Sequence, residues 1–207
     1  IALHPDGVGG KLAIVKAIKD AGGEVIDVTP NTPGVRIETS DNQEELFVVV
    51  DEYDNIIAHR SRYDCHHDKT LIHRTVGVLV YNNEGKLLLQ KRSLTKDTSP
   101  GKWAISCAGH VEKGQTYEEA LSRELKEELG IATSATYLKK FIAADETETE
   151  MASLYRADSN GPFSPNPEEI AEIRWVDPKE LPLRAAAGEL SLSPCAKISL
   201  HEAGILP

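Results

Sequence analysis

The sequence is poor in cysteine and in long apolar runs. Its three cysteines, Cys65, Cys107 and Cys195, lie far apart, which excludes a closely spaced zinc motif and a dense disulfide framework. We therefore expect free thiols in a reducing compartment, and hence a cytoplasmic protein. No apolar run approaches the roughly 20 residues that a membrane-spanning helix needs, so no membrane partner is expected.

Positive charge is also scarce. The chain carries 23 Lys and Arg residues against 33 Asp and Glu residues, and its formal net charge is −10. The basic residues form no stripe, which argues against duplex nucleic acid as the main partner. The length of 207 residues and the hydrophobic content of 40% are ordinary for a soluble protein, and they allow one sizeable domain with an appendage.

Residues 1–40 differ in pattern from the rest of the chain. They predict a short β-α-β appendage: a strand at 1–3, a helix at 10–21 and a strand at 24–28, followed by a Pro- and Gly-containing loop. The stretch IALHPDGVGGKL faintly resembles the start of ribose-5-phosphate isomerase B. That family needs a much longer domain, so we expect no such activity here. The segment is interpreted as a structural appendage or a dimerisation element, which makes a homodimer the protein partner to consider.

Residues 44–207 are predicted to form one mixed α/β domain. Alternating and β-branched runs, separated by turn residues, predict strands at 46–50, 56–60, 75–81, 86–91, 103–107, 137–144, 151–156 and 173–176. Helices are expected to start at about Thr116 and within Asp177–Leu181, and to cover 194–203. Strands around two or three helices favour an α/β/α sandwich with a mixed sheet.

The most informative segment is Gly109–Ile131, GHVEKGQTYEEALSRELKEELGI. Thr116 is a candidate N-cap, and Glu119 three residues later completes a capping box. Leucines recur behind it at helical spacing, and Gly130 follows as a stop signal. We therefore expect a loop that leads into an amphipathic helix.

Three acids share one face of that helix. Glu124, Glu127 and Glu128 stand at i, i+3 and i+4, so their carboxylates crowd together and repel one another. A hard divalent cation among them would resolve this repulsion. Mg²⁺ prefers carboxylate oxygens and is typically shared with substrate phosphates.

The offsets of these residues resemble the Nudix box, G-x5-E-x7-R-E-U-x-E-E-x-G-U, in which U is aliphatic. Gly109, Arg123, Glu124, Glu127, Glu128, Gly130 and Ile131 all match. The first glutamate of the pattern is Gln115 here, which can still accept a hydrogen bond from Arg123 but cannot form an ion pair with it. The resemblance implies a Nudix-type α/β/α sandwich. It also implies hydrolysis of a small-molecule diphosphate with Mg²⁺ or Mn²⁺, with Arg123 and the three glutamates in the catalytic centre.

A wider stretch, His73–Gln115, is similar to the branch that contains type 1 isopentenyl-diphosphate isomerase and its hydrolase relatives. This resemblance implies two further groups of site residues. One would hold a second divalent metal, with His67 as a substitute for the first histidine, and the other would bind the diphosphate. They are His66, His73, His110, Glu148 and Glu150 for the metal, and Arg92 and Lys96 for the phosphates.

The hydrolase and isomerase branches differ at one position. The isomerase needs a reactive cysteine where this chain has Ala108, and its box is usually degraded, whereas the box here is intact. Cys107 is adjacent, but neighbouring strand residues face opposite sides, so we expect it to be buried. We therefore expect a hydrolase. An isomerase-like enzyme and a non-catalytic binding module stay as alternatives, and no motif names the organic part of the substrate.

Overall fold

The computed structural model describes residues 45–96 and 98–207. The predicted β-α-β appendage at 1–40 lies outside the described residues. The residues from Glu45 to Pro207 form one compact unit. None of the helices in the described part of the chain has the length and apolar character needed to cross a membrane.

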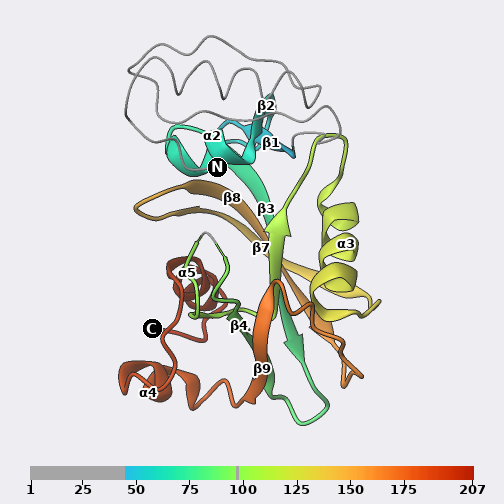
Figure 1. Ribbon diagram of the computed structural model, residues 1–207, viewed down its shortest axis with the longest axis vertical. Coiled ribbons are helices and arrows are strands. Elements are labelled where there is room, and N and C mark those ends of the chain that lie inside the picture. The colour runs from blue at the N-terminus through green and yellow to red at the C-terminus, as the bar shows by residue number, and fades with distance from the viewer. Residues whose placement is uncertain (1–44, 97) are drawn as a thin grey trace, which may run out of the picture. The chain divides into compact units, whose positions relative to one another are not determined.

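Nine strands of the described residues hydrogen-bond into one mixed sheet, accompanied by four labelled helices (Figure 1). In chain order the elements are β1 Leu46–Val50, β2 Ile56–Ser61, α2 Arg62–His67, β3 Ile72–Tyr81, β4 Leu87–Arg92, β5 Trp103–Ala104, β6 Cys107–His110, α3 Tyr117–Leu129, β7 Ala135–Ala144, β8 Thr149–Asp158, β9 Ile170–Val176, α4 Leu181–Ala186 and α5 Pro194–Glu202.

Strand β3 is the centre of the sheet. It runs parallel to β8 over its whole length, from the pair Ile72 and Thr149 to the pair Tyr81 and Asp158. It also pairs in antiparallel fashion with β6, and its first residues pair with β1. This register places His73 opposite Glu150 on β8.

The two faces of the sheet carry separate cores, because successive strand residues point to opposite sides. Val76, Val78 and Val80 of β3 pack with the leucines of α3. Leu79 of the same strand packs in a second cluster with residues of α4 and α5, among them Leu200. Figure 1 shows α3 on one side of the strands and α4 and α5 on the other, which confirms the predicted α/β/α arrangement.

One predicted strand was wrong in detail, and one helix was missed. The predicted strand 103–107 is two short strands, because β5 pairs with β4 whereas β6 pairs with β3. Ser106 lies between β5 and β6. It donates to the carbonyl of Leu88 and accepts from the amide of Val80, and these bonds stabilise the segment in which the chain passes from one strand to the other. Helix α4 begins at Leu181, within the predicted start, and α2 was not predicted.

Candidate active site

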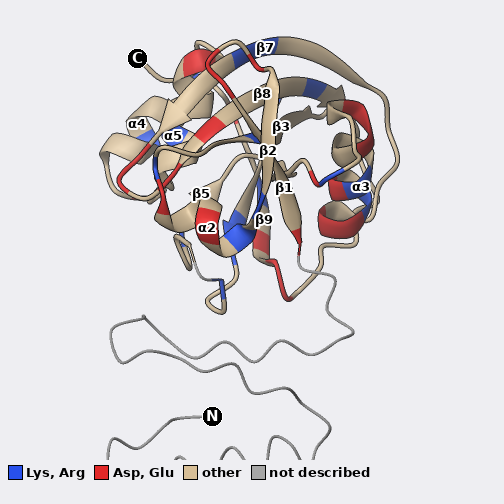
Figure 2. Cartoon of the chain, turned by 90° about the horizontal axis from the view of Figure 1, so that it is seen from above, with Lys and Arg blue, Asp and Glu red and all other residues tan. Residues whose placement is uncertain are grey.

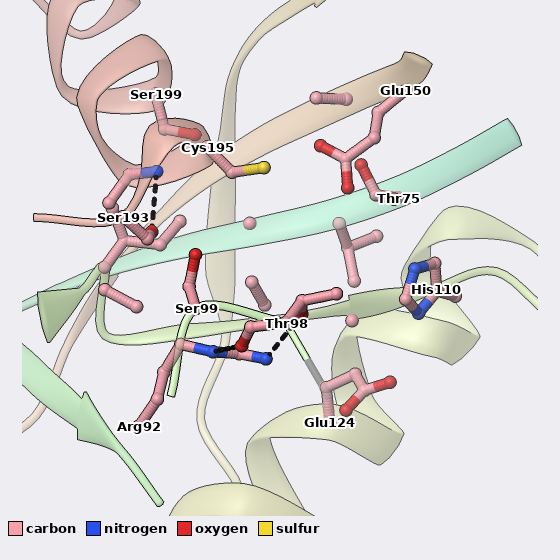
Figure 3. A pocket seen from close by; sticks show the side chains of 18 of the residues that line it. Thr75, Arg92, Thr98, Ser99, His110, Glu124, Glu150, Ser193, Cys195 and Ser199 are labelled. Atoms are coloured by element: carbon pink, nitrogen blue, oxygen red, sulfur yellow. Dashed lines mark hydrogen bonds between the residues drawn. The ribbon is translucent and has the colours of Figure 1, made fainter. Parts of the chain in front are cut away.

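A cavity of about 1160 Å³ gathers almost all of the predicted site residues. Its walls are the loop after β4, the start of β6, one face of α3, the β7–β8 turn and the start of α5. Of the predicted residues, all but His73 line it: Arg92, Lys96, His66, His110, Arg123, Glu124, Glu127, Glu128, Glu148 and Glu150. Side chains from both layers of helices therefore meet in one place (Figure 3).

The acidic face of α3 is held by the helix caps that the sequence indicates. Thr116 and Glu119 form the reciprocal capping box, and Gly130 ends the helix in the left-handed conformation. Figure 2 shows that acidic residues recur along α3. Two of the three box carboxylates, those of Glu124 and Glu128, are buried, whereas Glu127 is exposed.

Gly109 allows Glu124 to reach the cavity. A Cβ atom on Gly109 would lie 1.9 Å from Oε1 of Glu124, a distance that no two such atoms can adopt. The carboxylate of Glu124 therefore occupies the space that any other residue at position 109 would fill. This contact explains physically why strand β6 has glycine at this position.

Arg123 links the loop to the helix. Its guanidinium donates to the carbonyl of His110 at 2.9 Å and lies 2.9 Å from the carboxylates of both Glu124 and Glu127. It also reaches Oε1 of Gln115 at 3.5 Å, so the expected hydrogen bond to the substituted position is present but long. Glu112 contributes a further ion pair with Arg123 at 3.2 Å.

Burial makes the box carboxylates reluctant to ionise. It raises the pKa of Glu124 to about 8, and the adjacent Glu128 acts in the same direction, while Arg123 opposes both. Burial also raises the pKa of Glu128 to about 7, although hydrogen bonds to its carboxylate lower it. Two of these bonds come from Nε2 of Gln90, at 2.9 Å, and from the amide of Ala108, at 3.3 Å. A cation among these carboxylates would favour their charged forms.

A second group of donors lies beside the first. One ligand atom from each of His66, His73, His110 and Glu148 lies within 4.8 Å of the others. Nε2 of His66 is 3.2 Å from Nε2 of His110 and 3.1 Å from the carboxylate of Glu148. Phe47 stacks on His110, with ring centroids 3.9 Å apart, and thereby orients the imidazole.

These donors fit a divalent cation. Burial lowers the pKa of His73 to about 4 and holds the pKa of His110 well below its usual range, so both rings are neutral and can coordinate a metal. Within the described residues, the fully buried Nε2 of His73 has no hydrogen-bond partner and lies 3.6 Å from Glu148. A buried nitrogen without a partner is costly, and a metal ion would satisfy it.

Two other predicted ligands lie outside this group. Glu150 follows Glu148 by two residues, which is about 6.6 Å along a strand, and its carboxylate is not among the donors that converge with the histidines. Burial, followed by the Glu148 charge, raises the pKa of Glu150 to about 8. His67 points elsewhere, because its ring stacks on Tyr63 and its Nδ1 lies 2.8 Å from the Tyr63 carbonyl.

The two predicted phosphate-binding cations lie at the end of β4 and in the loop that follows it. Arg92 donates to the carbonyl and the hydroxyl of Thr98, both at 2.9 Å, which orients the guanidinium (Figure 3). Lys96 forms an ion pair with Glu169. Both side chains line the cavity, where they would attract an anionic group.

The structure also adds residues that the sequence did not indicate. Gln90 holds Glu128 from a neighbouring strand, and Asp145 and Cys195 form another group of potential ligands with Glu148. They are distant from the box in sequence and belong to no motif, so only the tertiary structure brings them to the cavity. Cys107, by contrast, is fully buried in the α3-side core, as predicted, while the exposed Ala108 lines the cavity.

Comparison with known proteins agrees with this geometry. Residues 71–194 match the NUDIX domain family. A Nudix hydrolase of Yersinia pestis, itself uncharacterised, is 37% identical over 66% of this chain and 75% of its own length. Isopentenyl-diphosphate Delta-isomerase I of Camptotheca acuminata is 33% identical over 73% of this chain and 77% of its own. A crystal structure from Deinococcus radiodurans is 29% identical, covers 76% of this chain and 98% of its own, and gives a TM-score of 0.67.

Proposed function

Because the chain belongs to the Nudix family, we propose that it is a Mg²⁺-dependent hydrolase that cleaves the diphosphate linkage of a nucleotide or another small organic diphosphate. One observation carries the proposal. The intact acidic face of α3, the cations Arg92 and Lys96 and the histidine group line or adjoin a single cavity. Such a cavity holds metal ligands and an anion-binding wall together.

Glu124, Glu127 and Glu128 are the proposed Mg²⁺ ligands, and Mn²⁺ suits the same oxygens. A bound divalent ion would polarise phosphoryl oxygens and lower the pKa of the attacking water. His66, His73, His110 and Glu148 would hold a second divalent ion. Each of these groups lies on a paired strand, on a capped helix or beside one, so little reorganisation is required when substrate binds.

The remaining charged residues bind and orient the substrate. Arg92 presents a planar donor pair that suits a phosphate group, and Lys96 adds a point charge. The proton of the attacking water needs a carboxylate acceptor. Glu127 is the exposed acid of the box, whereas Glu128 already accepts two hydrogen bonds and Glu148 lies against His66. We therefore assign Glu127 as the first candidate base, with Glu128 and Glu148 as competitors.

The proposal is tested by phosphate release from a panel of nucleoside diphosphates and triphosphates, sugar nucleotides and prenyl diphosphates, with and without Mg²⁺. The unmodified protein is expected to hydrolyse at least one of them only when Mg²⁺ is present. Glu127→Gln should lower that rate about 10³-fold, because it removes a ligand or base that acts in the transition state.

The control is Glu118→Gln, which changes an exposed glutamate of the same helix that does not line the cavity. It should leave the rate unchanged. Equal rates for the unmodified protein and Glu127→Gln would contradict the assignment of this residue. Absence of Mg²⁺-dependent release across the whole panel would favour a binding module.

An isomerase acting on isopentenyl diphosphate is the second candidate, because the histidine group and the Camptotheca relative point to that branch. Isomerisation needs an acid and a base that face the carbon skeleton. Ala108 offers neither, and the Cys107 side chain is fully buried in the core. We expect no dimethylallyl diphosphate when the protein is incubated with isopentenyl diphosphate and followed by proton NMR, and its appearance would reverse the choice.

A further inference from the structure

A group of mixed oxygen and sulfur donors lies on the wall of the cavity formed by the β7–β8 turn and α5. One ligand atom from each of Asp145, Glu148 and Cys195 lies within 4.8 Å of the other two. Asp145 and Glu148 belong to the turn before β8, whereas Cys195 is the second residue of α5. All three line the cavity, and neither Asp145 nor Cys195 belongs to the box or to the histidine group.

The turn presents one oxygen of Asp145 to the thiol. Oδ1 of Asp145 accepts from the amide and hydroxyl of Thr147, at 2.7 and 2.8 Å, and from the amide of Glu148 at 3.1 Å. Oδ2 lies 3.9 Å from Sγ of Cys195. An oxygen and a sulfur that share a tetrahedral zinc ion are about 3.6 Å apart, given metal bonds near 2.1 and 2.3 Å. The two atoms are thus almost at the separation that an ion between them would need.

Cys195 is held in this position by packing and capping. Ser193 caps α5 by accepting a hydrogen bond from the amide of Ala196 at 3.2 Å. Ala196 and Leu200 anchor the helix in the core on that side of the sheet. Figure 3 shows the sulfur of Cys195 and the carboxylate of Glu150 pointing toward one another from α5 and β8. The thiol therefore faces a carboxylate-lined wall, and its helix has little freedom to turn away.

The positive charges that act on this wall, those of Lys69 and Arg92, do so without direct contact. Across residues 45–96 and 98–207, no lysine or arginine forms an ion pair with Asp145 or Glu150. The thiol adds a ligand that becomes anionic when it binds a metal. A metal cation would bring a positive charge into direct contact with these carboxylates, at the point where the ligand atoms of Asp145, Glu148 and Cys195 converge.

We propose that Asp145, Glu148 and Cys195 form a binding site for a thiophilic divalent cation such as Zn²⁺, separate from the acidic face of α3. Sulfur and imidazole favour Zn²⁺, whereas carboxylate oxygen alone favours Mg²⁺, so the thiol sets the preference. Three protein ligands leave a tetrahedral ion with one open position, which here faces the cavity. Glu148 belongs to both this group and the histidine group, and its two carboxylate oxygens can serve one ion each.

Co²⁺ is the probe that tests this site, because a thiolate bound to Co²⁺ gives a charge-transfer absorption band in the near ultraviolet that nitrogen and oxygen ligands do not give. The full chain is stripped of metal with a chelator and titrated with Co²⁺ while the spectrum and the number of bound ions are recorded. The unmodified protein should develop the thiolate band. Cys195→Ser should lose the band and one bound ion, and Asp145→Asn should weaken that binding step at least tenfold.

Matched controls separate this site from its neighbours. Cys107→Ala removes a buried core thiol, and Glu146→Gln changes an exposed acid in the same turn, so both should keep the band. His73→Gln should also keep it, because the histidine is not one of the proposed ligands. Absence of the band in the unmodified protein, or its persistence in Cys195→Ser, would overturn the proposal. Since the readout is metal binding, either result stands independently of the hydrolase activity.

Discussion

At the scale of single residues, the site depends on a glycine, which has no side chain. Gly109 is a strand residue of β6, and its Cα lies under the carboxylate of Glu124. The backbone there accepts any residue, so the requirement for glycine comes from the close approach and not from an unusual conformation. Even the methyl group of an alanine at position 109 would therefore disturb the cavity.

Gly109→Ala should displace the Glu124 carboxylate from its present position. Because the new methyl group would overlap Oε1, the side chain must rotate away, and a misplacement of about 1 Å costs on the order of 10²-fold in rate. We expect that loss in Mg²⁺-dependent phosphate release, together with weaker Mn²⁺ binding measured by calorimetry.

Gly85→Ala is the comparison variant for this prediction. Gly85 lies in the β3–β4 turn with φ of 75°, and nothing lies within 4 Å of the added Cβ. It should lower stability by about 1 kcal/mol through backbone strain and leave the rate of the folded enzyme unchanged. If Gly109→Ala behaved in the same way as Gly85→Ala, the close approach to Glu124 would have no catalytic role.

At the scale of elements, Asp54 joins three of them to the β1–β2 turn. Its carboxylate accepts from Nε of Arg74 on β3 at 2.6 Å and from the hydroxyl of Tyr117 on α3 at 3.0 Å, and it pairs with Lys140 on β7. Its backbone adopts the left-handed conformation, with φ of 67°, which Asp tolerates better than most residues. The start of α3 is thus tied to the sheet by one partly buried carboxylate.

Asp54→Ala should cost about 2–3 kcal/mol, because it leaves two cations and a phenol without their shared acceptor. Chemical denaturation followed by tryptophan fluorescence measures this change. Asp158→Ala breaks the exposed Arg156–Asp158 pair instead and should change stability by less than about 0.5 kcal/mol. Similar losses of stability in both variants would show that the contacts of Asp54 contribute no more than an exposed ion pair does.

The elements also show which signals a sequence carries and which it does not. Helix α3 was predicted with its caps, because Thr116, Glu119 and Gly130 act within a few residues of one another. The split between β5 and β6 was missed, because it depends on which distant strand each one pairs with. Helix α2 was missed as well, although Ser61 caps it by accepting a hydrogen bond from the amide of Asp64. It is only six residues long and has no apolar stripe.

The candidate site likewise has one part that the sequence predicts and one part that it does not. Its acidic face follows from local spacing on one helix, and the histidine group was reached through the family resemblance and not from spacing alone. Gln90, Asp145 and Cys195 could not be predicted, because their approach depends on sheet order and on the docking of α5. Glu150 was assigned to the histidine group, yet the step along β8 places it nearer to Cys195.

At the scale of the whole molecule, the buried carboxylates give the metal-free protein an unusual pH dependence. Glu124, Glu128 and Glu150 have pKa values of about 8, 7 and 8 in the folded state, against 4.5 for an ordinary glutamate. Between these values the folded protein holds protons that the unfolded chain has already released. Stability must therefore fall as the pH rises through this range.

The cleanest window lies between about pH 7.5 and 8.5, where His73 and His110 are neutral in the folded state and almost entirely neutral in the unfolded chain, so that they contribute little. In a chelator, the free energy of unfolding should fall by on the order of 1–2 kcal/mol across this window. Glu124→Gln should flatten the fall, because a neutral amide has no proton to lose. Mg²⁺ should oppose the fall in the unmodified protein, and a stability that rises with pH in the chelator would contradict these assignments.

The walls of the cavity come from two kinds of structure. Apart from Glu148 in the β7–β8 turn, the acidic and imidazole groups lie on α2, β3, β6 and α3, where backbone pairing and helix caps hold them in place. The remaining wall comes from the loop after β4, the β7–β8 turn and the start of α5. Loops tolerate substitution and insertion far better than paired strands do. Homologous chains can therefore differ in the molecule that they recognise and still keep the same reaction chemistry.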